Sequence, residues 1–170
     1  MATPGDRAPL SDDDAMELAL AEARAAAAEG EVPVGAVALI AGCAVSARHN
    51  ERERTGDPTA HAEMLALRDA AAAVGGWRLS EVTVVVTLEP CPMCAGALVA
   101  ARVSRLVYGA SDPRAGACGT LYNLCGDPRL NHELMVTNGI RADDCGALLT
   151  SFFAEKRTGP EGAPDMGEDI

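Results

Sequence analysis

Residues 82–87 read VTVVVT, and no other segment limits the fold of this chain as strongly. Every side chain in the run is β-branched, which favours extended backbone. The run does not alternate polar with apolar positions, so we expect a strand buried on both faces. Pro90 follows shortly after and suits the first turn of a helix, because the N–H that it lacks is unpaired there. The segment therefore predicts a buried strand that leads directly into a helix.

Helical and extended patterns alternate along the rest of the chain. Ser11 and Asp14 form a start typical of a capping box, and the Ala-rich helix that follows is expected to end at Gly30. Short apolar runs on either side of Gly42 predict a β-hairpin. Further helices are expected at 59–74 and 141–154, and further strands at 105–110 and 134–137. This alternation predicts an α/β sheet covered by crossover helices.

The ends of the chain differ in composition from its centre. Residues 1–10 and 158–170 are rich in Pro, Gly and Asp, which is typical of disordered tails around a single folded domain at 11–157. No segment reaches the roughly 18 apolar residues of a membrane span. The first residues contain no apolar core of the signal-peptide kind. We therefore expect a cytoplasmic protein without a membrane partner.

Charge is unevenly distributed along the 170 residues. The formal net charge is −11, which excludes a global basic footprint for nucleic acid. Residues 32–153 nevertheless hold 12 acidic and 10 basic residues. A local basic surface can form there from seven arginines, at positions 48, 52, 54, 102, 105, 114 and 129.

Six cysteines in a chain without an export signal argue against a disulfide framework. Cys91 and Cys94 lie at the predicted start of a helix, where free N–H groups and the helix dipole favour thiolates. Their spacing suits two ligands of one metal ion, and it is also the spacing of a redox dithiol. The other four are interpreted as small buried apolar side chains: Cys43, Cys118, Cys125 and Cys145.

His61 and Glu63 fall in the first turn of the helix predicted at 59–74. Taken singly, such a histidine is more often structural and such a glutamate is more often a solvated charge. His61 together with Cys91 and Cys94 supplies three ligands and leaves a fourth tetrahedral position open, which is typical of catalytic zinc. Zinc lowers the pKa of water that it binds to about 7, and Glu63 would carry the proton to a ring nitrogen and then to the departing amine. The joint order H-x-E and then P-C-x-x-C matches the signature of zinc-dependent nucleobase deaminases.

Two stretches carry a closer resemblance. Thr59-Ala-His-Ala-Glu63 and Thr87-Leu-Glu-Pro-Cys-Pro-Met-Cys-Ala-Gly96 resemble the bacterial tRNA-specific adenosine deaminases, which convert the wobble adenosine of an anticodon to inosine. Residues 31–37, 109–113, 131–132 and 145–153 are also similar to segments of that family, so the resemblance covers about residues 12–157.

The resemblance implies a three-layer αβα cytidine-deaminase-like fold, with a mixed sheet of about five strands and helices on both faces. It also implies a homodimer, one Zn²⁺ per chain, and the anticodon stem-loop of tRNA as the substrate. The matching positions make His61, Cys91 and Cys94 the metal ligands and Glu63 the proton shuttle.

Five further residues are assigned to substrate binding through the resemblance: Asn50, Asp112, Val34, Leu88 and Pro90. Asn50 would hydrogen-bond the flipped nucleotide, and Asp112 would contact the RNA backbone near it. Backbone groups of residues 88–91 would line the oxyanion side of the site. Without the resemblance, Asn50 is interpreted as a turn residue at a strand end and Asp112 as a cap.

Two alternative functions stay open at this point. A deaminase of a free nucleobase or nucleoside, such as cytosine or guanine, would fit the acidic charge because its substrate carries no phosphates to repel. A redox protein that uses Cys91 and Cys94 as a dithiol is the other alternative.

Overall fold

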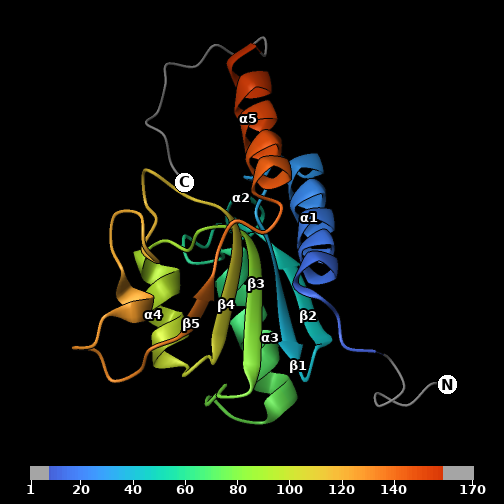
Figure 1. The fold of residues 1–170 in the computed structure, drawn as a ribbon. Coiled ribbons are helices and arrows are strands. Elements are labelled where there is room, and N and C mark those ends of the chain that lie inside the picture. The colour runs from blue at the N-terminus through green and yellow to red at the C-terminus, as the bar shows by residue number, and fades with distance from the viewer. Residues whose placement is uncertain (1–7, 159–170) are drawn as a thin grey trace, which may run out of the picture.

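A five-stranded mixed sheet, in the order β2-β1-β3-β4-β5, forms the centre of the computed structural model, which describes residues 8–158 (Figure 1). β1 pairs antiparallel with β2 and β3, whereas β3–β4 and β4–β5 are parallel. The mixed sheet predicted by the resemblance is confirmed. Its strands are β1 (Gly35–Ile40), β2 (Cys43–His49), β3 (Val82–Leu88), β4 (Arg105–Ala110) and β5 (Met135–Thr137).

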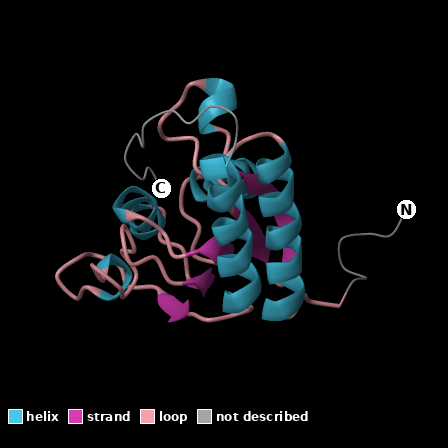
Figure 2. Ribbon diagram, turned by 90° about the horizontal axis from the view of Figure 1, so that it is seen from above, coloured by secondary structure: helices cyan, strands magenta, loops and turns pink. Residues whose placement is uncertain are grey.

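Helices cover both faces of the sheet and make three layers. α3 (Ala62–Val74) and α4 (Pro92–Ala100) pack on one face. α1 (Asp12–Ala28) and α5 (Ala142–Thr158) lie side by side over the other (Figure 2). A one-turn helix α2 (Arg52–Thr55) and a 3₁₀ helix η1 (Leu124–Gly126) lie in the connections. Most of α5 extends beyond the end of the sheet (Figure 1).

β3 is buried as its sequence predicts. Val84 and Val86 pack into the core under α3 and α4, while Val85 packs into the core under α1. Val85 faces Val37 of β1 and Val107 of β4 across the sheet, and all three are fully buried. Each buried valine contributes about 2 kcal/mol of apolar transfer free energy, so a strand that is apolar on both faces is stable only between two helical layers.

The capping box predicted at the start of α1 is present, since Ser11 accepts the backbone N–H of Asp14 and Asp14 accepts that of Ser11.

α1 approaches β1 closely because the facing side chains are small. A Cβ atom added at Gly35 would lie 1.9 Å from the carbonyl oxygen of Ala19. Glycine at this position therefore lets the helix rest directly on the strand backbone.

Several boundaries differ from the sequence-based prediction. α3 begins at Ala62, so His61 is its N-cap with extended backbone (φ −74°, ψ 150°) and does not lie in the first turn as we predicted. The residues before it are held in a separate turn, where Thr59 donates its N–H and hydroxyl to Asp57. α2 was not predicted, and α5 continues to Thr158.

The two predicted tails fall largely outside the described residues, which exclude 1–7 and 159–170. Leu10, assigned to the N-terminal tail, donates its N–H to the carbonyl of Gly42 and packs against the core under α1. The packed domain therefore includes this residue. Among residues 8–158, no helix has the length and hydrophobicity needed to cross a membrane.

Candidate active site

The N-termini of α3 and α4 meet beside the carboxyl end of β3, and this junction assembles the candidate metal centre. His61 is the N-cap of α3. Cys91 is the N-cap of α4, Pro92 is the first helical residue, and Cys94 lies in the first turn. The predicted strand-to-helix connection thus delivers both sulfurs to the start of one helix, opposite the start of another.

The three predicted ligand atoms lie at distances suited to one metal ion. Nδ1 of His61 is 3.5 Å from Sγ of Cys94 and 3.8 Å from Sγ of Cys91. All three donor atoms lie within 4.8 Å of one another. Zn–N bonds of about 2.0 Å and Zn–S bonds of about 2.3 Å in a tetrahedron place nitrogen and sulfur about 3.6 Å apart. The residues therefore fit a tetrahedral zinc ion with one position left for a further ligand.

Electrostatics in this junction favour a thiolate. Hydrogen bonds from Cys94 and then from His61 lower the pKa of the Cys91 thiol to about 4, against the opposing effect of burial. The same pairing raises the pKa of Cys94, and the hydrogen bond to Cys91 raises that of His61. The three side chains alone stabilise one negative sulfur. A bound cation would stabilise both, because a coordinated thiol is deprotonated.

Glu63 is buried beside this cluster, with 4% of its surface exposed. Burial raises the pKa of its carboxyl group to about 7. Its Oε2 atom has no hydrogen-bond partner within the described part of the chain. A buried carboxyl oxygen without a partner is costly in a merely structural residue. A pKa near neutrality is, however, what a general acid and base requires.

Asn50 lies at the end of β2 and holds the start of α3. Its Oδ1 accepts the N–H of Ala62 at 2.9 Å, and its Nδ2 donates to the carbonyl of Val32 at 3.1 Å. The side chain is buried, with the residue 6% exposed. Asn50 therefore fixes the backbone between His61 and Glu63, in addition to any contact with substrate.

Asp112 is also buried, at 1% exposure. Its Oδ1 accepts the N–H groups of Arg114 and Ala115, which is the local cap expected without the resemblance. Its Oδ2 has no hydrogen-bond partner among residues 8–158. One oxygen of this carboxylate thus stabilises a turn, while the other remains unpaired.

The other three residues assigned to substrate binding, Val34, Leu88 and Pro90, are buried in the described structure. The carbonyl of Val34 accepts the N–H of Asn50, and the carbonyl of Pro90 accepts the N–H of Ala117. The first contact places Val34 next to Asn50, and Pro90 directly precedes the candidate metal ligand Cys91 in the chain.

Glu89 has a structural role that the sequence did not reveal. It is 2% exposed, and its carboxylate accepts the backbone N–H groups of Asp112, Cys118 and Thr120, each at 3.0 Å, and the Thr120 hydroxyl. Burial opposes ionisation, but these hydrogen bonds lower the pKa of Glu89 below its usual value. One carboxylate therefore fastens residues 112–120 to the end of β3, two positions before Cys91. The only signal in the sequence is a charged residue at the end of a buried strand.

The local basic surface expected from seven arginines is largely neutralised. Arg102 donates to the side chain of Asn131. Four of the seven form ion pairs within the chain: Arg48 with Glu51 and Asp69, Arg54 with Glu51, Arg105 with Asp12, and Arg129 with Asp127.

A family model described as the cytidine and deoxycytidylate deaminase zinc-binding region matches residues 10–110. The fold and the ligand set thus define a zinc-binding deaminase domain.

The chain is 49% identical to the tRNA-specific adenosine deaminase of Bacillus subtilis over 142 residues, which cover 84% of this chain and 88% of that protein. It is 44% identical to the protein of the same name from Haemophilus influenzae, over 86% of this chain and 85% of that one. The chain therefore belongs to the cytidine and deoxycytidylate deaminases and, among them, to the tRNA-specific adenosine deaminases.

Solved structures of two kinds resemble this fold. One comes from studies of A-to-I editing by tRNA:A34 deaminases at the wobble position of transfer RNA. It has a TM-score of 0.77 and 41% identity, over 79% of this chain and 98% of that one. The other is a guanine deaminase from Nitrosomonas europaea, with a TM-score of 0.76 and 27% identity, over 89% of this chain and 90% of that one.

Proposed function

We propose that this protein is a zinc-dependent hydrolase that converts adenosine to inosine at the wobble position of a tRNA anticodon. The observation that carries the proposal is the cluster of His61, Cys91 and Cys94 beside the buried carboxyl group of Glu63. The cluster occurs in a chain that is 49% identical to a tRNA-specific adenosine deaminase.

The three ligands would hold one zinc ion per chain. When bound, zinc acts as a Lewis acid that makes water acidic enough to be a nucleophile at neutral pH. Glu63 accepts a proton from the attacking water, passes it to a ring nitrogen, and later delivers a proton to the departing amine. Adenosine and water thereby give inosine and ammonia. A carboxyl group with a pKa of about 7 can perform both transfers, because both of its forms are populated at neutral pH.

A nucleotide in an anticodon loop suits a site of this kind. A base must leave its stack to reach a buried catalytic group, and a base that is already unpaired in a hairpin loop costs little to flip out. We assign Asn50 and the unpaired Oδ2 of Asp112 to contacts with this nucleotide. Val34, Leu88 and Pro90 would line the pocket around it.

Internal pairing of the arginines leads us to expect few contacts between this chain and RNA phosphates. The logarithm of the binding constant falls with the logarithm of salt concentration in proportion to the phosphates that are neutralised. We therefore expect a shallow slope, which titration of a labelled stem-loop at several salt concentrations would measure. A slope typical of six or more contacts would contradict this expectation.

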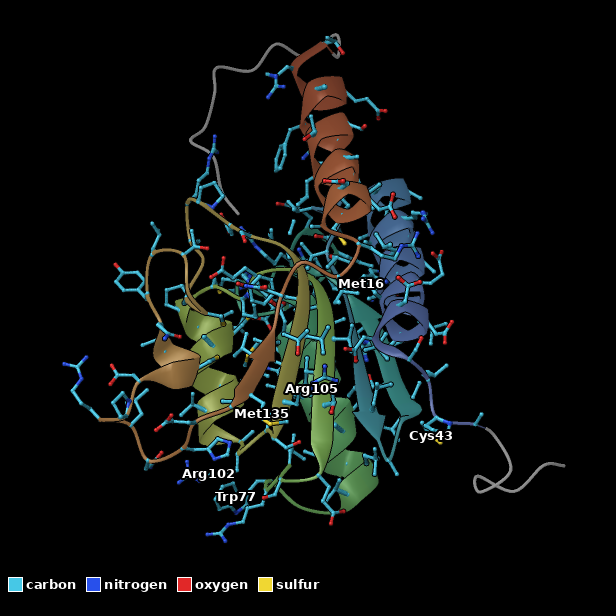
Figure 3. All side chains as sticks on the ribbon, in the orientation of Figure 1. Met16, Cys43, Trp77, Arg102, Arg105 and Met135 are labelled. Atoms are coloured by element: carbon cyan, nitrogen blue, oxygen red, sulfur yellow. The ribbon has the colours of Figure 1, made fainter. Side chains whose placement is uncertain are left out.

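We also propose a homodimer in the cytoplasm, in which a second copy covers the outer side of α4. Trp77 and Leu130 are 59% and 40% exposed. They line a hollow together with Val99, Ala100 and Arg102, and Figure 3 shows Trp77 and Arg102 close together at this end of the molecule. A contiguous exposed apolar surface marks an interaction site.

Sedimentation tests the dimer directly. Leu130→Asp should shift the protein toward the monomer mass, whereas Leu18→Asp, at a similarly exposed position on α1, should not. A monomeric wild-type protein would contradict the proposal.

A deaminase of free nucleobases is the second candidate, supported by the structural likeness to a guanine deaminase and by the net charge of −11. The deciding experiment compares an adenosine-bearing anticodon stem-loop with free adenosine, cytosine, cytidine and guanine as substrates of the zinc-loaded protein. We expect inosine in the stem-loop and little ammonia from the free compounds. Ammonia release from a free compound at an equal or higher rate would favour the second candidate.

A further inference from the structure

Two thiols outside the candidate metal centre lie in direct contact. Sγ of Cys118 is 3.3 Å from Sγ of Cys125, and the two residues are 5% and 0% exposed. A tight turn joins them: Cys118 pairs with Asn123 in an isolated antiparallel bridge, and Gly119 donates its N–H to the carbonyl of Tyr122. The turn holds the two sulfurs against each other beneath exposed residues.

The distance between these sulfurs argues against a metal site. Two thiolates bound to one tetrahedral zinc lie about 3.8 Å apart, given Zn–S bonds of about 2.3 Å. The 3.3 Å separation is shorter and leaves no place for an ion between them. Among residues 8–158, the only group of three side chains arranged for a metal is His61, Cys91 and Cys94. The second pair is therefore suited to sulfur–sulfur chemistry.

We propose that Cys118 and Cys125 form a reversible intramolecular disulfide when the protein meets a small hydroperoxide. One thiolate attacks a peroxide oxygen, giving a sulfenic acid and hydroxide. The other sulfur then attacks the sulfenic sulfur, the S–S bond forms, and water leaves. The two thiols lose two electrons, and hydrogen peroxide is reduced to two waters. A thiol reductant reverses the step by thiol–disulfide exchange.

Local geometry permits this reaction. The sulfurs must approach from 3.3 Å to the disulfide length of about 2.05 Å. Gly119 follows Cys118 directly and has φ +141°, a backbone conformation that favours glycine, so no side chain on this residue crowds the turn. Residues 119–123, which lie between the two cysteines, are exposed, so the core does not enclose this turn.

The bond would also tighten residues 112–120 near the metal centre. The N–H of Cys118 donates to Glu89, and the carbonyl of Cys125 accepts the N–H of Leu134. A disulfide between Cys118 and Cys125 would also close a short loop in the unfolded chain and reduce its conformational entropy. We expect the oxidised protein to keep its metal and to unfold at a temperature about 5 °C higher.

Mass spectrometry of the zinc-loaded, full-length protein tests the proposal. Trypsin releases residues 115–129 as one peptide that contains both cysteines. After treatment with hydrogen peroxide, this peptide should be 2 Da lighter and should no longer react with an alkylating reagent. Reduction with dithiothreitol should restore two alkylation sites. The peptide of residues 79–102, which carries Cys91 and Cys94, should keep both thiols in the zinc-loaded protein.

The matched variants are Cys125→Ala and Cys43→Ala. The first should abolish the 2 Da loss, whereas the second, which removes a cysteine of β2, should leave it unchanged. Two results would overturn the proposal: full alkylation of both cysteines in the treated wild-type peptide, or sulfinic acid in place of the disulfide. Both are measured on the wild-type protein, so the test holds even where a variant fails to fold.

Discussion

Two pairs of cysteines lie in this molecule, and they have different surroundings. Cys91 and Cys94 begin a helix, three positions apart, and face a histidine nitrogen at 3.8 and 3.5 Å. Cys118 and Cys125 lie seven positions apart in a long connection and face each other at 3.3 Å.

A third side chain beside two sulfurs separates a metal site from a pair of neighbouring thiols. Nδ1 of His61 lies at distances from the first two sulfurs that suit a tetrahedral ion, and the three side chains form a candidate ligand set. The second pair has no such partner in the described chain, and its sulfurs touch. Sequence spacing alone left both a metal site and a redox dithiol open at the first pair, whereas the structure brings the sulfurs of the second pair into direct contact.

Removing one sulfur from the first pair should have the largest effect. Cys94→Ala should reduce zinc from about one ion per chain to nearly none, because two ligands hold the metal poorly, and deamination should fall to background. Elemental analysis and the stem-loop assay measure both. An active, metal-free protein would break the distinction between the two pairs.

Glu63→Ala should reduce turnover by about 10² to 10⁴-fold, the range for a positioned general acid and base, without loss of zinc. The variant separates proton transfer from metal binding at the first pair. Glu63→Gln is the matched control, since it keeps the shape of the side chain but cannot carry the proton. Loss of metal in either variant would mean that Glu63 is a ligand.

Glu89→Ala should destabilise the fold, because it leaves the N–H groups of Asp112, Cys118 and Thr120 without this partner, and the first two hydrogen bonds are buried. Each such group costs about 1–3 kcal/mol, so the midpoint of thermal unfolding should fall by roughly 10 °C. The zinc content should stay near one per chain, since Glu89 positions the segment that carries Cys118 and does not bind metal. An unchanged midpoint would show that these hydrogen bonds contribute little.

Cys125→Ala should have the smallest effect. Loss of a buried sulfur costs about 1 kcal/mol and should lower the unfolding midpoint by about 3 °C. Zinc content and turnover on the stem-loop should stay within twofold of wild type. Calorimetry and the activity assay test this, and a loss of zinc like that of Cys94→Ala would erase the contrast between the pairs.

Local sequence patterns were sufficient for much of the fold. The run VTVVVT predicted β3, the capping box predicted the start of α1, and the runs around Gly42 predicted the β1–β2 hairpin. The motifs around His61 and Cys91 also predicted which side chains would meet. The residues of each motif are near neighbours in the sequence, and each motif lies at the start of a helix, next to the end of a strand.

Other features depended on packing between distant residues. Arg105 forms an ion pair with Asp12, 93 positions away in the sequence. Its charge therefore no longer contributes to the basic surface that the number of arginines suggested. Cys118 and Cys125 were interpreted as ordinary buried cysteines, and Glu89, within the motif at 87–96, had no role assigned to it. Only the folded loop brought four donors to that carboxylate.

Local sequence patterns were therefore sufficient for the strands, the starts of α1 and α4 and the types of candidate ligand, because these follow from the conformational preferences of neighbouring residues. Packing of the layers settled which charges are neutralised, which sulfurs touch, and which carboxyl oxygens of the described residues are buried without a hydrogen-bond partner. Those properties depend on desolvation and on distances between segments, which exist only once the layers have packed.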